Sequence, residues 1–120
     1  MIRKVAFTMF PMTDVARARK FYEETLGLAI GSHGNRGEQW WIEYDLPEGG
    51  CIALQNFDDA QPGGSGTLAL EVEDLDALMA HLTANGVAFK GDVVHGPNCR
   101  MAMCSDSEGN PLLLHQLNPK

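Results

Sequence analysis

The sequence lacks the features of a disulfide-bonded, zinc-binding or membrane protein. Its cysteines, Cys51, Cys99 and Cys104, are odd in number and form no Cys-x-x-Cys motif, so we expect reduced structural thiols. No apolar run approaches the ~18 residues of a membrane span. No signal-peptide stretch follows Met1 either. These absences favour a soluble, cytoplasmic protein.

Basic residues are also scarce. Nine Lys and Arg against 16 Asp and Glu give a formal net charge of -7. Nucleic-acid and anionic-membrane surfaces need clustered cations, so we expect neither partner. Glycine-rich phosphate loops and Gly-x-Ser-x-Gly elbows are missing too. What remains, 120 residues of which 44% are hydrophobic, is the composition of one globular domain.

The chain contains an internal repeat with a shift of sixty residues. Asp14 and Asp74 are each a helix N-cap after an apolar strand, and apolar stripes follow at helical spacing over 15–26 and after residue 75. The glycine turn and apolar strand at 48–55 recur at 108–115. This predicts two β-α-β-β-β modules, at about 1–57 and 67–120, with a linker at about 58–66. Further strands are expected at 29–33 and 39–44, and at 87–94 and 100–104.

Three passages carry a resemblance to a known family. They are the helix from Phe21-Tyr22 to Leu26-Gly27-Leu28, the segment 70–76, and the closing turn 106–111. In this order and spacing the chain resembles the vicinal oxygen chelate superfamily of glyoxalases, extradiol dioxygenases, fosfomycin-resistance enzymes and bleomycin-resistance proteins. The resemblance implies an α+β fold in which a curled, cup-shaped mixed sheet, with helices outside, holds the site. It also implies a homodimer.

The resemblance further implies four metal-ligand positions, which fall on Phe7, Ala53, Thr67 and Leu113. Phenylalanine, alanine and leucine offer no donor atom, and a threonine hydroxyl is a poor ligand. We therefore predict no metal cofactor, and we do not expect a standard metal-dependent glyoxalase or dioxygenase.

Strand alternation indicates which side chains face the cup. Trp40 and Trp41 must face opposite sides, so either one of them provides a stacking wall for a planar or cationic ligand, or both are structural aromatics. His115 is either a hydrogen-bond donor or acid/base group at the cup floor, or a structural histidine bonded to backbone. The expected ligand pocket comprises Phe7, Met9, Trp40, Trp41, Gln55, Thr67, Glu71, Met101 and His115.

Three functions fit these features. The leading hypothesis is a metal-free small-molecule binding protein similar to the bleomycin-resistance branch. The alternative is a lyase, isomerase or dioxygenase-like enzyme that holds a metal at displaced ligands, His115 with Glu43 or Glu71. The third is an interaction module whose cup is filled by its own side chains. Nothing in the sequence indicates a lowered pKa for Cys104, so we do not expect a cysteine nucleophile.

Overall fold

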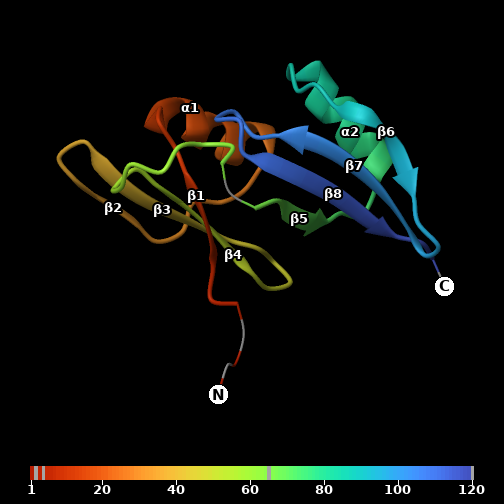
Figure 1. Ribbon diagram of the computed structural model, residues 1–120, viewed down its shortest axis with the longest axis horizontal. Helices are drawn as coiled ribbons and strands as arrows, with labels where there is room; N and C mark the ends of the chain where they lie inside the picture. Colours follow the sequence, from red (N-terminus) through yellow and green to blue (C-terminus); the bar gives the residue numbers. More distant parts are fainter. Residues whose placement is uncertain (2, 4, 65, 120) are drawn as a thin grey trace.

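The chain folds into two modules of the same element order (Figure 1). A computed structural model describes residues 1, 3, 5–64 and 66–119. The first module contains β1 (Thr8–Pro11), α1 (Val15–Lys20), the π-helical turn η1 (Phe21–Thr25), β2 (His33–Arg36), β3 (Gln39–Asp45) and β4 (Cys51–Gln55). The second contains β5 (Leu68–Glu71), α2 (Leu75–Ala84), β6 (Lys90–His95), β7 (Cys99–Ser105) and β8 (Pro111–Leu117).

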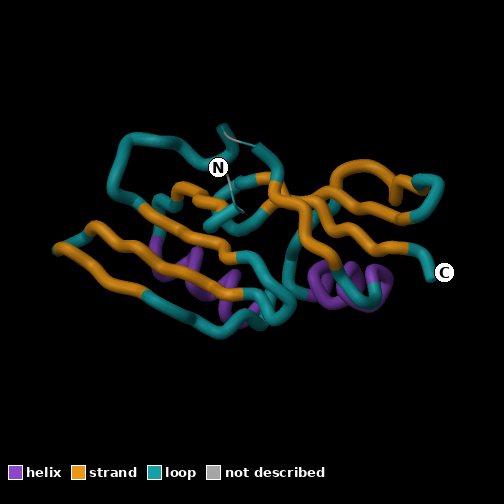
Figure 2. Tube along the Cα trace, turned by 90° about the horizontal axis from the view of Figure 1, so that it is seen from below, coloured by secondary structure: helices purple, strands orange, loops and turns teal. Residues whose placement is uncertain are grey.

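Each module builds its own four-stranded mixed sheet. The strand orders are β1-β4-β3-β2 and β5-β8-β7-β6, and β1–β4 and β5–β8 are the parallel pairs. Thr8 pairs with Ile52 and Leu68 pairs with Leu112, so the register repeats with the shift of sixty residues. Figure 2 shows the two groups of strands beside each other, each with its own helix. The predicted α+β fold with curled mixed sheets is confirmed, although the strands form two sheets and not one.

The predicted helix caps are confirmed, but the first helix ends differently from the prediction. The carboxylates of Asp14 and Asp74 each accept a backbone N–H at 3.0 Å, from Arg17 and Ala77. The last turn of the first helix is a π turn, because the N–H of Leu26 bonds to the carbonyl of residue 21 at 2.8 Å. No helix in the described part of the chain is long and apolar enough to cross a membrane.

The wider turn suits the core beneath it. Phe21 and Tyr22 are neighbours in the chain, and both are buried. In the structure their rings meet edge to face with centroids 5.4 Å apart. A regular α-helix separates neighbouring side chains by about 100°, whereas a π turn allows both rings to reach the same core. The sequence periodicity that predicted one α-helix over 15–26 could not reveal this change.

The strand expected at 29–33 is a wrong prediction. The strand is instead β2 at His33–Arg36, which pairs with the start of β3. Gly37 makes this register available, because it turns the chain with φ +62°, a conformation that favours glycine. His33 therefore belongs to a strand, and its Nδ1 lies 2.9 Å from the carbonyl of Gly31.

One hydrophobic core extends through both modules. In the first module Tyr22 stacks on Tyr44, with ring centroids 5.5 Å apart. In the second, α2 buries Leu75 and Leu82 against Leu112 and its neighbours on β8. Because these buried residues form a single cluster, apolar burial stabilises the modules together.

A buried polar network joins the modules at one side, and we call it the sealed junction. Its residues are Arg17, Tyr22, Asp106, Glu108 and Asn110. The Asp106 carboxylate accepts the Tyr22 hydroxyl at 2.9 Å, the Asn110 side-chain amide at 2.9 Å and the Asn110 backbone N–H at 2.8 Å. The Asn110 amide also donates to the carbonyl of Pro11 at 3.0 Å. Two of these hydrogen bonds, from Tyr22 to Asp106 and from Asn110 to Pro11, cross the module boundary, and no buried side-chain N or O atom of the described residues lacks a partner.

The linker between the modules packs on the same turn. The N–H of Gly63 donates to the side-chain oxygen of Asn110 at 3.0 Å. Gly63 has φ +85°, and a Cβ at this position would lie 3.1 Å from the carbonyl oxygen of Gly109. Glycine is thus required here both by its backbone conformation and by the close approach of the turn.

Glu108 caps the first helix from the second module. One carboxylate oxygen accepts the backbone N–H groups of Thr13 and Asp14, both at 3.0 Å, and the other lies 2.6 Å from Nε of Arg17. Burial alone would raise the pKa of Glu108, but the Arg17 guanidinium and the two N–H groups outweigh it and lower the pKa to about 2.

This lowered pKa predicts a pH-dependent contribution to stability. The Glu108 carboxylate stabilises the fold above its unfolded pKa of about 4.5, and the contribution is lost as the pH falls through the folded value of about 2. Because Arg17 is half-exposed and partly screened, we expect Glu108→Gln to lower the free energy of unfolding by about 2 kcal/mol at pH 7. Urea unfolding should show this difference shrinking between pH 4.5 and 2.

Glu48 offers a matched control, because it occupies the equivalent position in the first module and is exposed. Glu48→Gln should change the unfolding free energy by less than about 0.5 kcal/mol at any pH. Equal losses in the two variants would contradict the assignment of Glu108 as an inter-module cap.

Candidate functional site

Each sheet has one face covered by its helix and one face that we call its open face. The open face of the first sheet carries Met9, Glu43 and Ala53, which are neighbours across β1, β4 and β3. The second carries Ala69, Leu113 and Met103 at the equivalent positions across β5, β8 and β7. Most of the predicted pocket residues lie on these two faces.

An aromatic pair dominates the open face of the first sheet. The rings of Phe7 and Trp41 meet edge to face, with centroids 5.4 Å apart and an interplanar angle of 86°. The indole N–H of Trp41 donates to Glu43 at 2.7 Å, so the carboxylate is held beside the rings. Phe7 and Met9 are each 44% exposed. This face therefore offers an accessible aromatic surface with one adjacent negative charge.

The structure resolves which tryptophan lies on which side. Trp41 lies on the open face, whereas Trp40 packs against the hydrophobic core on the helix-covered side. Of the predicted pocket residues, Trp40 is thus the one placed away from the rest. The physical reason is the alternation of side chains along β3, which allows only one of two neighbours on each face.

Gln55 lies on the open face of the first sheet, but its side-chain amide is already hydrogen-bonded within the chain. It pairs with Trp41 across the sheet and is only 2% exposed. Its side-chain amide donates to Asp58 at 3.1 Å, and its side-chain oxygen accepts the backbone N–H of Phe57 at 2.7 Å. This bond to Gln55 also lowers the pKa of Asp58. Gln55 therefore holds the chain leaving β4.

His115 and Glu71 form the polar group on the second sheet. Nδ1 of His115 lies 2.6 Å from one Glu71 oxygen, and the other oxygen accepts the backbone N–H of Leu117 at 2.9 Å. The hydrogen bond from His115 lowers the pKa of Glu71. Met101 pairs with His115 across the sheet, and Thr67 is exposed just before β5.

The two polar groups remain separate. Gln55 and His115 are equivalent in the repeat, yet no hydrogen bond among the described residues joins one to the other. The second open face is flexible and sulfur-rich where the first is aromatic, since Met101 stands at the position equivalent to Trp41. Within one chain the predicted residues thus form two half-sites on two sheets.

The family's four metal-ligand positions do not fit a divalent cation. Ala53 and Leu113 are strand neighbours of Met9 and Ala69, and neither has a donor atom. Phe7 uses its ring against Trp41. Among the described residues, no group of three or more His, Cys, Asp or Glu side chains is arranged to hold a metal ion.

Cys104 is buried on the helix-covered side of β7. Burial raises the pKa of this thiol to about 11, so it is a thiol and not a thiolate at neutral pH. Its surroundings are those of a core residue.

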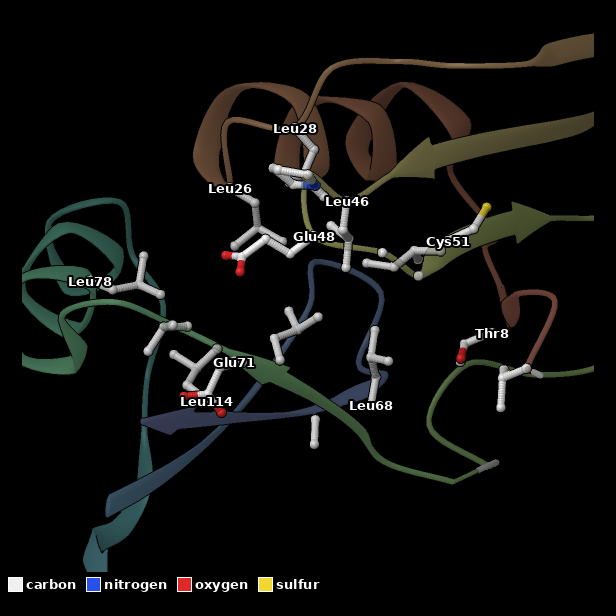
Figure 3. Close-up of a pocket in the computed structure, with 18 residues that line it drawn as sticks. Thr8, Leu26, Leu28, Leu46, Glu48, Cys51, Leu68, Glu71, Leu78 and Leu114 are labelled. Carbon is white, nitrogen blue, oxygen red and sulfur yellow. The ribbon is translucent and has the colours of Figure 1, made fainter. Parts of the chain in front are cut away.

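A cavity of about 520 Å³ lies between the modules and was not anticipated from the sequence. Leucine, contributed by both modules, is its most frequent lining residue (Figure 3). The signal was present in the repeat. At several positions where one copy has large polar residues the other has leucine, alanine or glycine, and this contrast leaves space at one of the two equivalent places.

Paired β-α-β-β-β modules with open, curled mixed sheets define the structural class of this chain. The chain belongs to the Glyoxalase/Bleomycin resistance protein/Dioxygenase superfamily, whose sequence profile matches residues 4–114. The resemblance inferred from the sequence is thus confirmed. None of the curated proteins matches the chain significantly.

Several solved structures share the fold. TnmS3, an antibiotic binding protein from Streptomyces sp. CB03234, is 30% identical, with 98% of each chain covered and a TM-score of 0.83. A glyoxalase/bleomycin resistance protein from the same organism is also 30% identical, covering 92% of this chain and 97% of its own, with a TM-score of 0.77. The fosfomycin resistance protein FosX from Listeria monocytogenes is 15% identical, with 96% and 94% covered and a TM-score of 0.80, so this likeness concerns the fold alone.

The separation of the two polar groups yields a reciprocal prediction. His115→Ala should raise the pKa of Glu71, because the carboxylate loses its main hydrogen-bond donor, and should leave the pKa of Asp58 unchanged. Gln55→Leu should raise the pKa of Asp58 and leave the pKa of Glu71 unchanged. Carboxyl ¹³C NMR titrations of the three proteins measure both groups, and a shift of both pKa values in either variant would contradict the separation.

Proposed function

We propose that this protein binds a small molecule on its open sheet faces without a metal, and so sequesters it in the cytoplasm. The observation that carries the proposal is the exposed pair of Phe7 and Trp41, with Glu43 fixed beside it. Aromatic rings at an accessible site favour a planar ligand by stacking, and the carboxylate favours a ligand with positive charge. A protein that only sequesters its ligand needs no catalytic group.

Two further observations support this proposal. The four metal-ligand positions of the family carry no suitable donor set in this chain. TnmS3, 30% identical over 98% of the chain, is described as an antibiotic binding protein, which makes an antibiotic-like aromatic compound a reasonable ligand class. The methionines of the second open face would adapt to such a ligand, because methionine side chains are flexible and polarizable.

A homodimer would complete the site. Met9 and Phe7 are each 44% exposed and Leu117 is 60% exposed, so a single chain leaves apolar open-face residues in water. β1 and β5 are also edge strands of their sheets, and uncovered edges favour association with another chain. We propose that a second copy covers these surfaces, and that the half-sites of two chains then face a shared ligand.

The enzyme alternative has less support. His115 and Glu71 bring one imidazole and one carboxylate together, but Glu43, the other displaced ligand considered, lies on the other sheet and is bonded to Trp41. Two side chains make an incomplete ligand set for a catalytic metal. The pair instead resembles a structural contact that also holds the backbone of Leu117.

The binding proposal predicts a specific loss on mutation. We expect proflavine, a planar aromatic cation, to bind the purified protein, and Trp41→Ala to weaken that binding about tenfold through loss of stacking and cation–π contacts. Isothermal titration calorimetry measures both. Trp40→Phe is the matched control, because Trp40 lies on the other side of β3, and its binding should equal that of the wild type.

The metal content of the protein provides a second test of the binding proposal. Binding should be unchanged after dialysis against EDTA, and elemental analysis should find less than stoichiometric divalent metal in the purified protein. Stoichiometric metal, or binding that requires it, would overturn the metal-free proposal and favour the enzyme alternative.

The dimer is tested by mass in solution. Light scattering at micromolar concentration should give twice the chain mass of 13.1 kDa. Met9→Lys should shift the protein toward the monomer, because a charged side chain on the apolar open face opposes its burial. Glu24→Lys, on the helix-covered side, should leave the dimer intact. A wild-type monomer would contradict this proposal.

A further inference from the structure

The inter-module cavity lies beside β5, an edge strand of the second sheet. Leu68 and Leu70 line it, and their strand partners are Leu112 and Leu114, which are buried beneath α2. The cavity is therefore mainly on the helix-covered side of the sheets, although Cys51, Ala69 and Glu71 of the open faces also contribute to its wall, and its 520 Å³ is within the range that holds small organic ligands. Its other leucines are Leu26, Leu28, Leu46 and Leu78 (Figure 3).

The repeat explains why there is space here. The two modules meet at two equivalent places, and only one of them is filled by the sealed junction. A shift of sixty residues maps Arg17, Tyr22, Asp106 and Asn110 of the sealed junction onto Ala77, Leu82, Leu46 and Gly50. Large hydrogen-bonding side chains are thus replaced by smaller or purely apolar ones, and Leu46 and Gly50 line the cavity.

One charged group of the sealed junction has an equivalent at the cavity. Glu48 is equivalent to Glu108 and lines the cavity. Figure 3 shows its carboxylate close to Leu26, on the side that faces α2. Glu108 binds the Arg17 guanidinium at 2.6 Å, whereas the residue equivalent to Arg17 is Ala77. The cavity therefore has the anion of the Arg17–Glu108 pair but not the arginine.

The second carboxylate at the cavity is already engaged. Glu71 contributes to the wall, but its two oxygens contact His115 and the N–H of Leu117. Together the two glutamates give the cavity a negative potential, which the net charge of -7 reinforces. An anionic ligand is thereby disfavoured.

We propose that this cavity is a second ligand site, selective for small amphiphilic cations. The apolar body of the ligand occupies the leucine-lined space, and its protonated amine or guanidinium binds Glu48 as the Arg17 side chain binds Glu108. The apolar contacts supply affinity and the carboxylate supplies selectivity. This site shares Glu71 with the second open face, but its lining includes neither Phe7 nor Trp41, the pair on which the proposed function rests.

A matched series of probes tests the selectivity. We expect 4-phenylbutylamine to bind more tightly than the neutral 4-phenylbutan-1-ol, and 4-phenylbutyrate to bind most weakly, as measured by isothermal titration calorimetry. Glu48→Gln should weaken binding of the amine about fivefold, the effect of an exposed charge pair, and should leave binding of the alcohol unchanged. The preference for the amine should also fall at 1 M salt.

Three further variants identify the site. Asp59→Asn removes the same charge from an exposed linker position and should leave amine binding unchanged. Leu78→Phe, on α2, should weaken both the amine and the alcohol by occupying cavity space, with folding checked by circular dichroism. Trp41→Ala should leave amine binding intact, which separates this site from the open-face site.

The proposal is overturned if the three probes bind equally, if Glu48→Gln leaves amine binding unchanged, or if Trp41→Ala abolishes it. In the last case the amine binds the open face, and the cavity is a packing defect between modules.

Discussion

The buried hydrogen bonds of Asp106 are the interaction on which the rest of the structure depends. This one carboxylate binds the Tyr22 hydroxyl of the first module and the Asn110 amide of its own turn, both at 2.9 Å. A buried charge is tolerated only when its hydrogen bonds are complete, so the two modules must meet in one relative position. Burial and the Asp106 charge also raise the pKa of Tyr22, which keeps its hydroxyl a donor. The orientation of both open faces follows from this junction.

The repeat has kept the fold in both copies while allowing the chemistry of the copies to differ. Asp14 and Asp74 cap their helices with the same 3.0 Å hydrogen bond. Trp41 and Met101 occupy the same strand position, yet one makes a rigid aromatic face and the other a flexible sulfur-containing one. A duplicated scaffold with two different faces can contact two different ends of one ligand. This property suits the binding of an asymmetric molecule.

The sequence was sufficient for the fold because a shift of sixty residues aligned caps, helices and turns at once. It was sufficient for the placement of Met9 and His115 on their strands, because alternation is local. It failed at 29–33 and in the last turn of the first helix, where Gly37 and the packing of two adjacent rings decide the outcome. Gln55 shows another limit. Its bonds to Asp58 and Phe57 depend on the path of a loop, which no strand pattern reveals.

The same comparison of copies distinguishes a structural charge from one available to a ligand. Glu108 and Glu48 have the same residue type and the same place in the repeat, but Glu108 is buried against Arg17 and two helix N–H groups. Those partners lower the pKa of Glu108, and its carboxylate therefore stabilises the fold. The repeat equivalent of that arginine is Ala77, which cannot pair with a carboxylate, so the fold does not need the Glu48 carboxylate as it needs that of Glu108. A carboxylate that the fold does not need, on the wall of an apolar cavity, is available to bind a cation from solution.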